Sequence, residues 1–228
     1  MPLTRIEVRS SNGSDSYATL PRGTRQVYDL LSGVYPLSTY FFHSKAHEEA
    51  IALSGIRNGM RVLEVATGSG EMFGRLTDLN PDGITVGLDL SPRMAARTQR
   101  IARAEYASVS AHCGAVDARI MPFRDNTFDA IMCCYLLELL SGDDIVVTLQ
   151  EIWRVLRPRA SFTLVLIGQN TGFFNRMYKL GGTVAPAFWG RQVEERIPDI
   201  IESLDFRIVN QKQVRQGFYP SRVLTARK

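Results

Sequence analysis

Val62 to Met72 reads VLEVATGSGEM, and the interpretation of the whole chain starts from this stretch. The short apolar run Val62–Val65 leads into a turn that contains Gly68 and Gly70, and a segment with helical character follows. Glycine suits such a turn because it adopts positive φ angles and lets a ligand approach the backbone closely. The stretch predicts a strand, a tight turn and a helix. It is compatible with a dinucleotide, a nucleotide, a nucleoside-type cofactor or a purely structural connection.

Strand-like and helical segments alternate along the rest of the chain. Such a rhythm predicts a mainly parallel sheet with helices on both faces. Besides the strand at 62–65, strands are expected at 84–90, 113–117, 128–135, 161–167, 207–214 and 218–226. Helices are expected at 23–34, 37–53, 71–79, 91–106, 141–156 and 192–204.

Composition indicates one ordinary globular domain. The 228 residues, 45% hydrophobic and 22% charged, suffice for one α/β domain with additional segments. We expect a flexible polar lead at 1–22 and a single domain at 23–228, with a helical flap at 23–56 and an aromatic and basic insertion at 168–190. The three cysteines lack metal or redox spacing and are expected to be buried free thiols.

Charge and hydropathy narrow the classes of molecule with which the protein is expected to interact. The net charge of +4 comes from 27 basic and 23 acidic residues scattered along the chain, which is too mild to indicate nucleic acid. No apolar run reaches the roughly 18 residues of a membrane span, and the N-terminal segment lacks an apolar signal core. A cytoplasmic protein is expected, with peripheral contact at the inner membrane surface left open.

Acidic residues stand at the ends of two further predicted strands, and they help to identify the class of ligand. Asp89 stands 19 residues after Gly70, where a carboxylate accepts hydrogen bonds from both hydroxyls of a ribose, and Asp117 follows the next strand. A dinucleotide site is poorly supported, because Phe73 or Glu71 occupies the third glycine position of the two possible frames. A Walker phosphate loop is excluded because the chain lacks its Gly-Lys-Ser/Thr motif.

Four segments, VLEVATGSGEM, GLDLSP, VDARIMPFRDNTFDAIMCCYLLELL and EIWRVLRP, resemble in order and spacing the motifs of class I S-adenosyl-L-methionine-dependent methyltransferases. The chain is most similar to the ubiquinone/menaquinone-biosynthesis methyltransferases and the bacterial phosphatidylethanolamine N-methyltransferases. The resemblance implies a Rossmann-like, doubly wound, mainly parallel seven-stranded sheet with an antiparallel last strand. Two departures are Ala66, where the family has its first glycine, and Pro158-Arg159-Ala160, where it has Pro-Gly-Gly.

The resemblance also implies the residues that bind S-adenosyl-L-methionine. The methionine end is assigned to Glu64, Ala66, Gly68 and Gly70; the ribose to Asp89; adenine to Leu90, Asp117 and Ala118; and the transferable methyl to the surroundings of Cys134 and Tyr135. No metal is expected. His43 and His47 have a spacing also used for metal, but the chain shows no third ligand, so a polar helix face is favoured.

The acceptor is the open part of the prediction. Methyl transfer from a sulfonium needs mainly alignment in a dry pocket, and a general base only for an acceptor that arrives protonated. Tyr35, Tyr40, His43, Tyr135 and Tyr178 are the candidates for contact with the acceptor, and Tyr135, with Tyr35 and His43 after it, is preferred as catalytic.

The substrate class stays broad at this point. A small or lipid-like acceptor is expected, with a phospholipid amine headgroup or a quinone precursor favoured. The insertion at 168–190 serves either as a lid packed on the sheet or as an amphipathic helix on a lipid surface. The alternatives are a module that binds the cofactor without catalysis and, less favoured, a nucleic-acid methyltransferase. The latter would show an Asn/Asp-Pro-Pro-Tyr/Phe motif where Cys133-Cys134-Tyr135-Leu136 stands.

Overall fold

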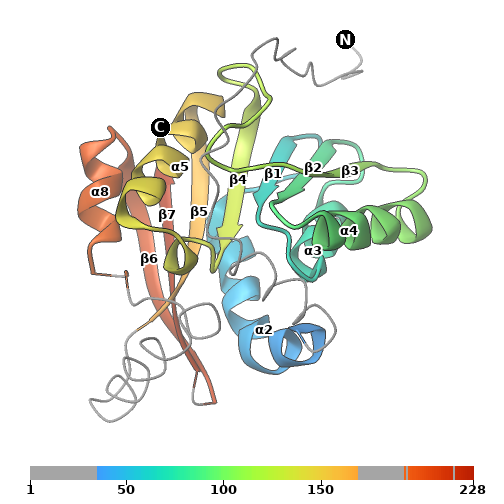
Figure 1. Cartoon of the computed structure of the whole chain (residues 1–228), viewed down its shortest axis with the longest axis horizontal. Coiled ribbons are helices and arrows are strands. Elements are labelled where there is room, and N and C mark those ends of the chain that lie inside the picture. Colours follow the sequence, from blue (N-terminus) through green and yellow to red (C-terminus); the bar gives the residue numbers. More distant parts are fainter. Residues whose placement is uncertain (1–34, 169–192, 194, 218) are drawn as a thin grey trace.

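A seven-stranded sheet in the order β3-β2-β1-β4-β5-β7-β6 forms the centre of the molecule (Figure 1). The computed structural model describes residues 35–168, 193, 195–217 and 219–228, with backbone alone at 35–43 and 219. The strands are β1 (Arg61–Val65), β2 (Ile84–Asp89), β3 (Ser110–Ala115), β4 (Phe128–Cys134), β5 (Leu156–Ile167), β6 (Arg207–Gln216) and β7 (Tyr219–Arg227). The helices are α2 (Tyr35–Ser54), α3 (Glu71–Leu79), α4 (Pro92–Glu105), α5 (Gly142–Val155) and α8 (Ile197–Ser203), with a 3-10 turn at Leu137–Leu139.

Strand direction agrees with the expected fold. The pairs β1–β2, β1–β4, β2–β3 and β4–β5 are parallel, whereas β7 is antiparallel to both β5 and β6. The prediction of a mainly parallel, doubly wound sheet with an antiparallel last strand is therefore confirmed. The helix expected at 23–34 and the insertion, apart from Gly168, lie outside the described residues.

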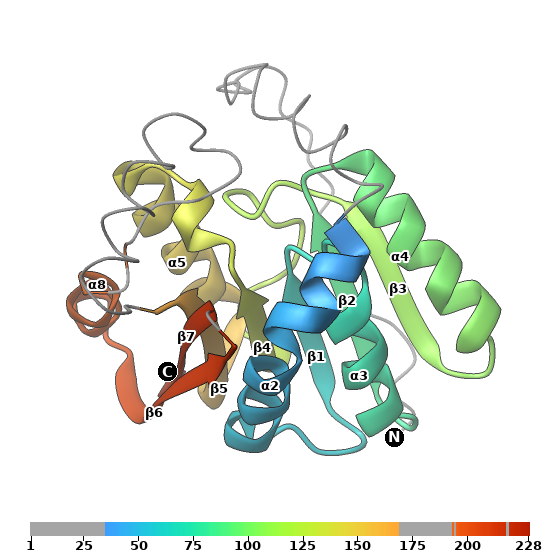
Figure 2. The same ribbon diagram turned by 90° about the horizontal axis from the view of Figure 1, so that it is seen from below.

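The two faces of the sheet carry separate hydrophobic clusters, because neighbouring residues of a strand point to opposite sides. Leu63 and Cys133 belong to the cluster that includes residues of α5 and α8, whereas Val62 and Met132 belong to the cluster that includes residues of α2 and α3. Figure 2 shows the same division, with α5 and α8 gathered on one side of the strands. Cys133 and its neighbour Cys134 likewise belong to opposite clusters; the three thiols are free as expected, but Cys113 and Cys134 are only half-buried.

Two helix starts show why the sequence folds as it does. Ser91 caps α4 by accepting from the Met94 N–H (3.4 Å), and Pro92 occupies the first turn. Ser141 caps α5 by accepting from the Asp144 N–H (3.1 Å). These caps fix where each helix begins, α4 shortly after β2 and α5 after the 3-10 turn that follows β4.

The second half of α2 packs on the sheet. Ala46 and Ala50 are buried, and the Lys45 N–H donates to Gln216 Oε1 on β6 (2.8 Å). Lys212 Nζ donates to Glu49 Oε1 (2.7 Å), and Ser161 Oγ donates to the Ser54 carbonyl (2.6 Å). This part of the expected flap is thus anchored to β5 and β6, while the aromatic side chains of its first half lie outside the described ones.

Three element bounds differ from the prediction. β3 begins at Ser110 and ends at Ala115, before Asp117, and α8 begins at Ile197, since 193, 195 and 196 are not helical. β5 begins at Leu156, whereas this strand was expected to begin at Ser161. The register jumps from Phe128–Leu156 to Ala130–Ser161, so the intervening residues bulge from the strand, with Arg159 at φ 66°.

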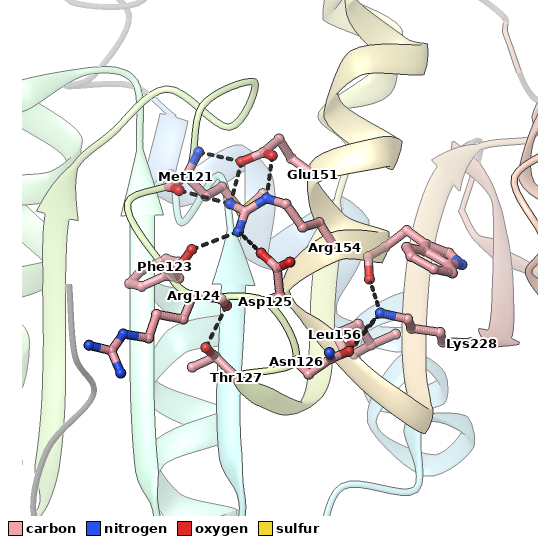
Figure 3. Close-up of polar contacts among 11 residues, drawn as sticks. Met121, Phe123, Arg124, Asp125, Asn126, Thr127, Glu151, Arg154, Leu156 and Lys228 are labelled. Atoms are coloured by element: carbon pink, nitrogen blue, oxygen red, sulfur yellow. Dashed lines mark hydrogen bonds and ion pairs between the residues drawn. The ribbon is translucent and has the colours of Figure 1, made fainter. Parts of the chain in front are cut away.

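Arg154 fixes the loop that joins Asp117 to β4 (Figure 3). Its guanidinium donates to the Phe123 carbonyl (2.7 Å) and the Met121 carbonyl (3.0 Å), and it forms ion pairs with Asp125 (2.8 Å) and Glu151 (2.6 Å). Glu151 in turn accepts from the Met121 N–H (2.7 Å). One side chain on α5 thereby provides hydrogen bonds to two backbone carbonyl groups of a loop that has no regular structure.

Candidate functional site

The turn after β1 is built from three residues with positive φ. Ala66 has φ 64°, Gly68 φ 50° and Gly70 φ 85°. The Ala66 N–H donates to the Leu88 carbonyl at 2.8 Å, so the turn is held against β2. The family glycine at position 66 corresponds here to an alanine in the left-handed region, a conformation that costs a non-glycine residue about 1–2 kcal/mol.

The two glycines of the turn serve different purposes. A Cβ atom on Gly70 would lie 3.0 Å from Ile101 Cδ1 and 3.1 Å from Thr98 Oγ1, so Gly70 allows α4 to pack close to the turn. A Cβ atom on Gly68 would meet no protein atom within 4 Å. The backbone at Gly68 is therefore open to a ligand, as expected for this turn.

Glu64 is a buried carboxyl group with an unmet bonding capacity. Its side chain is 1% exposed, and its Oε2 atom has no hydrogen-bond partner among the described residues. Burial, with the charges of Asp89 and Glu71, raises the pKa of the Glu64 carboxyl well above its ordinary value. A cationic group that bound here would satisfy Oε2 and offset the cost of ionising Glu64, which fits the amino group of a bound methionine moiety.

Asp89 ends β2 and holds the turn. Its Oδ2 atom accepts from the Gly68 N–H (2.8 Å), and its Oδ1 atom accepts from the Ser91 N–H (2.8 Å). A carboxylate oxygen has more than one acceptor site, so these bonds leave capacity for the ribose hydroxyls assigned to Asp89. The bonds also fix the direction of the carboxylate relative to Gly68.

Asp117 lies two residues beyond β3 and is engaged by Arg119. Arg119 Nη2 donates to Asp117 Oδ2 (2.7 Å), and Nη1 donates to Asp144 Oδ1 at the start of α5 (2.8 Å). Burial alone would raise the pKa of the Asp117 carboxyl, but its bonds with Arg119 outweigh that effect and lower it. Adenine would meet an ionised carboxylate that is already paired with a guanidinium.

Apolar side chains stand near both carboxylates. Leu90, next to Asp89, is 41% exposed, and Ile120, whose N–H donates to the Asp117 carbonyl (3.0 Å), is 68% exposed. Ala118 is half-buried beside Asp117. Leu90 and Ala118 were expected to contact adenine, whereas Ile120 was not. The sequence feature that could have indicated Ile120 is its position in the loop three residues after Asp117.

The end of β4 carries a strained tyrosine. Tyr135 has φ 55°, an uncommon conformation for a bulky residue, and its N–H donates to the Val165 carbonyl (2.8 Å). Its hydroxyl forms a 2.7 Å hydrogen bond with Ser221 Oγ on β7. Strain of this kind gathers at functional sites. Burial raises the pKa of the neighbouring Cys134 thiol, which keeps it neutral.

Two further residues complete this edge of the sheet. His47 on α2 is 4% exposed, and its Nδ1 atom lies 3.6 Å from Glu71 Oε1 in the first turn of α3. Its ring centroid lies 6.2 Å from that of Tyr135. From the sequence, His47 was considered only as a metal-binding partner of His43. Its position next to Ala46 and three residues before Ala50, both buried, could have indicated that His47 lies on the buried face of the helix. The side chains of Tyr35 and His43 are outside the described ones, so those two predictions stay predictions.

Glu138 holds the loop after β4. It is 1% exposed, and its Oε1 atom accepts from the Ile167 N–H at the end of β5 (2.6 Å). The sequence interpretation did not single out Glu138, because only the folded chain brings it to Ile167.

The described residues also settle two general questions. No group of three or more His, Cys, Asp and Glu side chains among them is arranged to hold a metal ion. None of the helices in the described part of the chain is both long and apolar enough to cross a membrane.

These features fit S-adenosyl-L-methionine. An unpartnered buried carboxylate oxygen at Glu64, an open backbone at Gly68, a carboxylate at Asp89 and an exposed apolar side chain at Leu90 follow one another along the carboxyl edge of β1 and β2. Ligands bind at this edge in open α/β sheets. The order of charged, polar and apolar groups matches the methionine, ribose and adenine parts of the molecule.

Comparison with known proteins gives the same assignment. Residues 62–159 match the family described as "Methyltransferase domain". The chain is 31% identical over 135 residues to a demethylmenaquinone methyltransferase of Roseiflexus sp., which covers 59% of this chain and 52% of that protein. It is 29% identical over 201 residues to a 2-phytyl-1,4-naphtoquinone methyltransferase of Trichormus variabilis, covering 83% and 86%. The aligned part thus spans about half the length of the Roseiflexus relative.

Solved structures share the fold at low sequence identity. An S-adenosyl-L-methionine-dependent methyltransferase from Aquifex aeolicus has a TM-score of 0.65 at 20% identity, covering 89% of this chain and 97% of that one. The [4+2]-cyclase SpnF has a TM-score of 0.70 at 18% identity, covering 90% and 96%. The chain thus contains a segment at residues 62–159 that matches a methyltransferase domain, and it shares its fold with S-adenosyl-L-methionine-dependent methyltransferases.

Proposed function

We propose that this protein transfers the methyl group of S-adenosyl-L-methionine to a ring carbon of a reduced naphthoquinone that carries an apolar side chain. The sulfonium supplies an electrophilic methyl group, and the protein contributes alignment in a site sheltered from water. The observation that carries the proposal is the similarity to the Trichormus naphtoquinone methyltransferase over most of both chains. The relative from Roseiflexus is likewise named for a quinone, and neither is named for a phospholipid headgroup.

Individual residues have separate roles in this proposal. Glu64 binds the amino group of the methionine moiety, Asp89 holds the ribose, and Leu90 with Ala118 lies against adenine. Tyr135, fixed by its bond to Ser221, forms the wall beside the transferable methyl. Tyr35 and His43 remain candidates for contact with the acceptor. The insertion at 168–190 is proposed as the acceptor cover, with contact at the membrane surface, where a quinone with a long apolar chain resides.

A transfer assay with radiolabelled methyl donor tests the proposal. Wild-type protein would be incubated with a reduced demethylated naphthoquinone, with vesicles of phosphatidylethanolamine and with small phenols. Label in the naphthoquinol product alone is the expected result, and Asp89→Ala is expected to abolish it together with binding of the donor in titration calorimetry. Label in the phospholipid instead would reverse the choice of acceptor.

A protein that binds the donor without methyl transfer is the alternative, and the similarity in fold to a [4+2]-cyclase gives it a concrete basis. Calorimetric binding of S-adenosyl-L-methionine with no labelled product from any of the three acceptor classes would favour this alternative. Binding that is unaffected by Asp89→Ala would argue against the assigned site itself.

A further inference from the structure

His47 and Glu71 form a pair that the methyl-donor site does not use. They come from different helices, α2 and α3, and meet with Nδ1 of His47 3.6 Å from Oε1 of Glu71. The His47 side chain is 5% exposed and that of Glu71 22%. The two helices bring an imidazole and a carboxylate together at a place shielded from water. Such a pair can act in proton transfer.

The charges around the pair keep Glu71 ionised. Contact with the His47 imidazole is the main cause that lowers the pKa of the Glu71 carboxyl, with Arg75 adding to it and burial opposing it. Arg75 Nη2 lies 3.0 Å from Glu71, and Arg75 Nη1 lies 3.8 Å from the exposed Glu48 on α2. Among the described residues, Glu64 on β1 is a further acidic group whose carboxyl interacts electrostatically with Glu71. An ionised Glu71 favours the tautomer of His47 that carries its proton on Nδ1, which leaves Nε2 as the basic atom.

The pair also lies beside the expected reaction centre. The ring of His47 is tilted by 45° against that of Tyr135, at 6.2 Å between centroids. Tyr135 directly follows the last residue of β4, and Glu71 directly follows Gly70 in the turn that carries the donor site. Figure 1 shows α2 beside the carboxyl end of β4. The imidazole is therefore placed between the residues assigned to the methionine moiety and the tyrosine beside the methyl group.

We propose that His47, oriented by Glu71, accepts the proton of a ring hydroxyl group on the methyl acceptor. The inference rests on the proposed function, because it assigns the base for a naphthoquinol. The O–H bond breaks, its proton moves to Nε2 of His47, and the electron pair shifts into the ring. The adjacent ring carbon then forms the C–C bond while the bond from sulfur to the methyl carbon breaks and its pair stays on sulfur. The hydrogen on that carbon then leaves to solvent as a proton, its bonding pair restores the ring, and the proton held on Nε2 returns to oxygen, so one proton is released overall.

Two substitutions and a matched control test this role. His47→Gln removes the base, Glu71→Gln keeps the imidazole but removes its orienting charge, and Glu48→Gln removes an exposed acid from the same helix. General-base catalysis contributes about 100- to 10,000-fold to a rate. We expect kcat with a naphthoquinol to fall at least about 100-fold in His47→Gln and about 10-fold in Glu71→Gln, with Glu48→Gln unchanged. Affinity for S-adenosyl-L-methionine is expected to stay within about 2-fold in all three.

The pH profile separates a base from a structural residue. A base accepts a proton only in its unprotonated form, so kcat of the wild type, measured with the methyl donor saturating, should rise with pH. This rise is expected to disappear in His47→Gln and to persist in Glu48→Gln. A rise that persists unchanged in His47→Gln overturns the proposal.

A binding measurement without the methyl donor keeps the two proposals apart. The probe is 1-naphthol, whose neutral and ionised forms differ in absorbance. Wild-type protein is expected to bind it in the ionised form at a pH where free 1-naphthol is neutral, and Glu71→Gln, which retains the buried ring, to do so less. Equal ionisation in the wild type, His47→Gln and Glu71→Gln refutes the role of His47. Failure of the wild type to methylate any naphthoquinol, with ionisation of the probe intact, instead refutes the acceptor assignment.

Discussion

Glu64 shows how a single residue can be unfavourable for the fold and favourable for the ligand. Its carboxyl group is buried, raised in pKa and unpartnered at Oε2. A group whose pKa is higher in the folded protein than in the unfolded chain contributes most to stability at low pH. That contribution is lost as the pH rises from the unfolded pKa through the folded one. At neutral pH the ionised form of Glu64 therefore destabilises the ligand-free protein.

Glu64→Gln should accordingly separate stability from binding. We expect the free energy of unfolding of the ligand-free protein to rise by about 1–3 kcal/mol at pH 7, because the uncompensated charge is gone. We expect affinity for S-adenosyl-L-methionine to fall about 10- to 100-fold, the value of one hydrogen bond to a charged group. Thermal unfolding and titration calorimetry would measure the two effects. A variant that is both less stable and unchanged in affinity contradicts the assignment of Glu64.

The same residue predicts a pH dependence of binding. A cation beside Glu64 favours its ionised form, so binding of the methyl donor should release a proton wherever Glu64 is protonated in the free protein. Affinity should then increase as the pH rises through the raised pKa. Calorimetric titrations in buffers of different ionisation enthalpy would detect the proton, and Glu64→Gln should show none. Proton uptake by the wild type would have the wrong sign.

Ala66 gives a prediction on backbone conformation. Ala66→Gly should relieve the left-handed strain of about 1–2 kcal/mol while adding about 0.4–1 kcal/mol of unfolded-state entropy, so the net gain in the free energy of unfolding is about 0.5–1 kcal/mol. Ala115→Gly on β3, where φ is negative, is the matched control and should lose about 0.5–1 kcal/mol. Denaturant unfolding measures both. Equal losses in the two variants would show that φ at Ala66 carries no strain.

At the scale of elements, the distance between the turn and α4 depends on one missing side chain. Gly70→Ala combines a strained φ with contacts of 3.0 and 3.1 Å to the side chains of Ile101 and Thr98, which have to shift by a few tenths of an ångström. Gly68→Ala adds strain alone, because no protein atom lies within 4 Å of its Cβ. We expect Gly70→Ala to lose about 2–4 kcal/mol of stability and Gly68→Ala about 1–2 kcal/mol.

For the affinity for S-adenosyl-L-methionine we expect the opposite order of the two variants, with the larger loss in Gly68→Ala. A methyl group on Gly68 points into the space assigned to the methionine moiety, so Gly68→Ala should weaken the affinity for S-adenosyl-L-methionine more than its small loss of stability suggests. Chemical unfolding combined with calorimetric titration tests the pair. A Gly68→Ala variant with wild-type affinity would mean that the ligand does not approach the backbone there.

The elements also show what a sequence can and cannot predict. β1, β2 and β4 are mostly buried and apolar, and their bounds were predicted to within one residue. β3 is the edge strand and reads SAHCGA, with little apolar signal, so its start was placed three residues late. The first residues of β5 could not be predicted as strand, because Pro158 and Arg159 carry no strand signal and only the pairing of Leu156 with Phe128 reveals the extension.

The candidate site divides in the same way. Gly68, Gly70 and Asp89 follow strands at fixed spacing, so their proximity could be predicted from local sequence. Arg119 meets Asp144, and His47 meets Glu71, across 25 and 24 positions, and nothing local indicates these pairs. Pairing across distant elements depends on how the helices pack on the sheet, and a single sequence does not show it.

For the whole molecule, Arg154 links α5 to the loop that carries the site residues toward β4. Its bonds to the carbonyls of Met121 and Phe123 and to Glu151 would all be lost in Arg154→Ala, which would leave buried acceptors unpaired (Figure 3). We expect a loss of about 2–4 kcal/mol in the free energy of unfolding, measured by denaturant titration. Arg100→Ala on the surface of α4 is the control, expected within about 0.5 kcal/mol of the wild type. A loss in Arg154→Ala no greater than in the control would refute the linking role.

The position of β7 has a consequence for how the chain is made. β7 is the last strand in the sequence, yet it lies inside the sheet, between β5 and β6. While the ribosome is still adding the residues before Tyr219, β5 lacks its antiparallel neighbour and β6 has no strand to pair with. β5 therefore exposes an unpaired hydrogen-bonding edge until β7 joins the sheet.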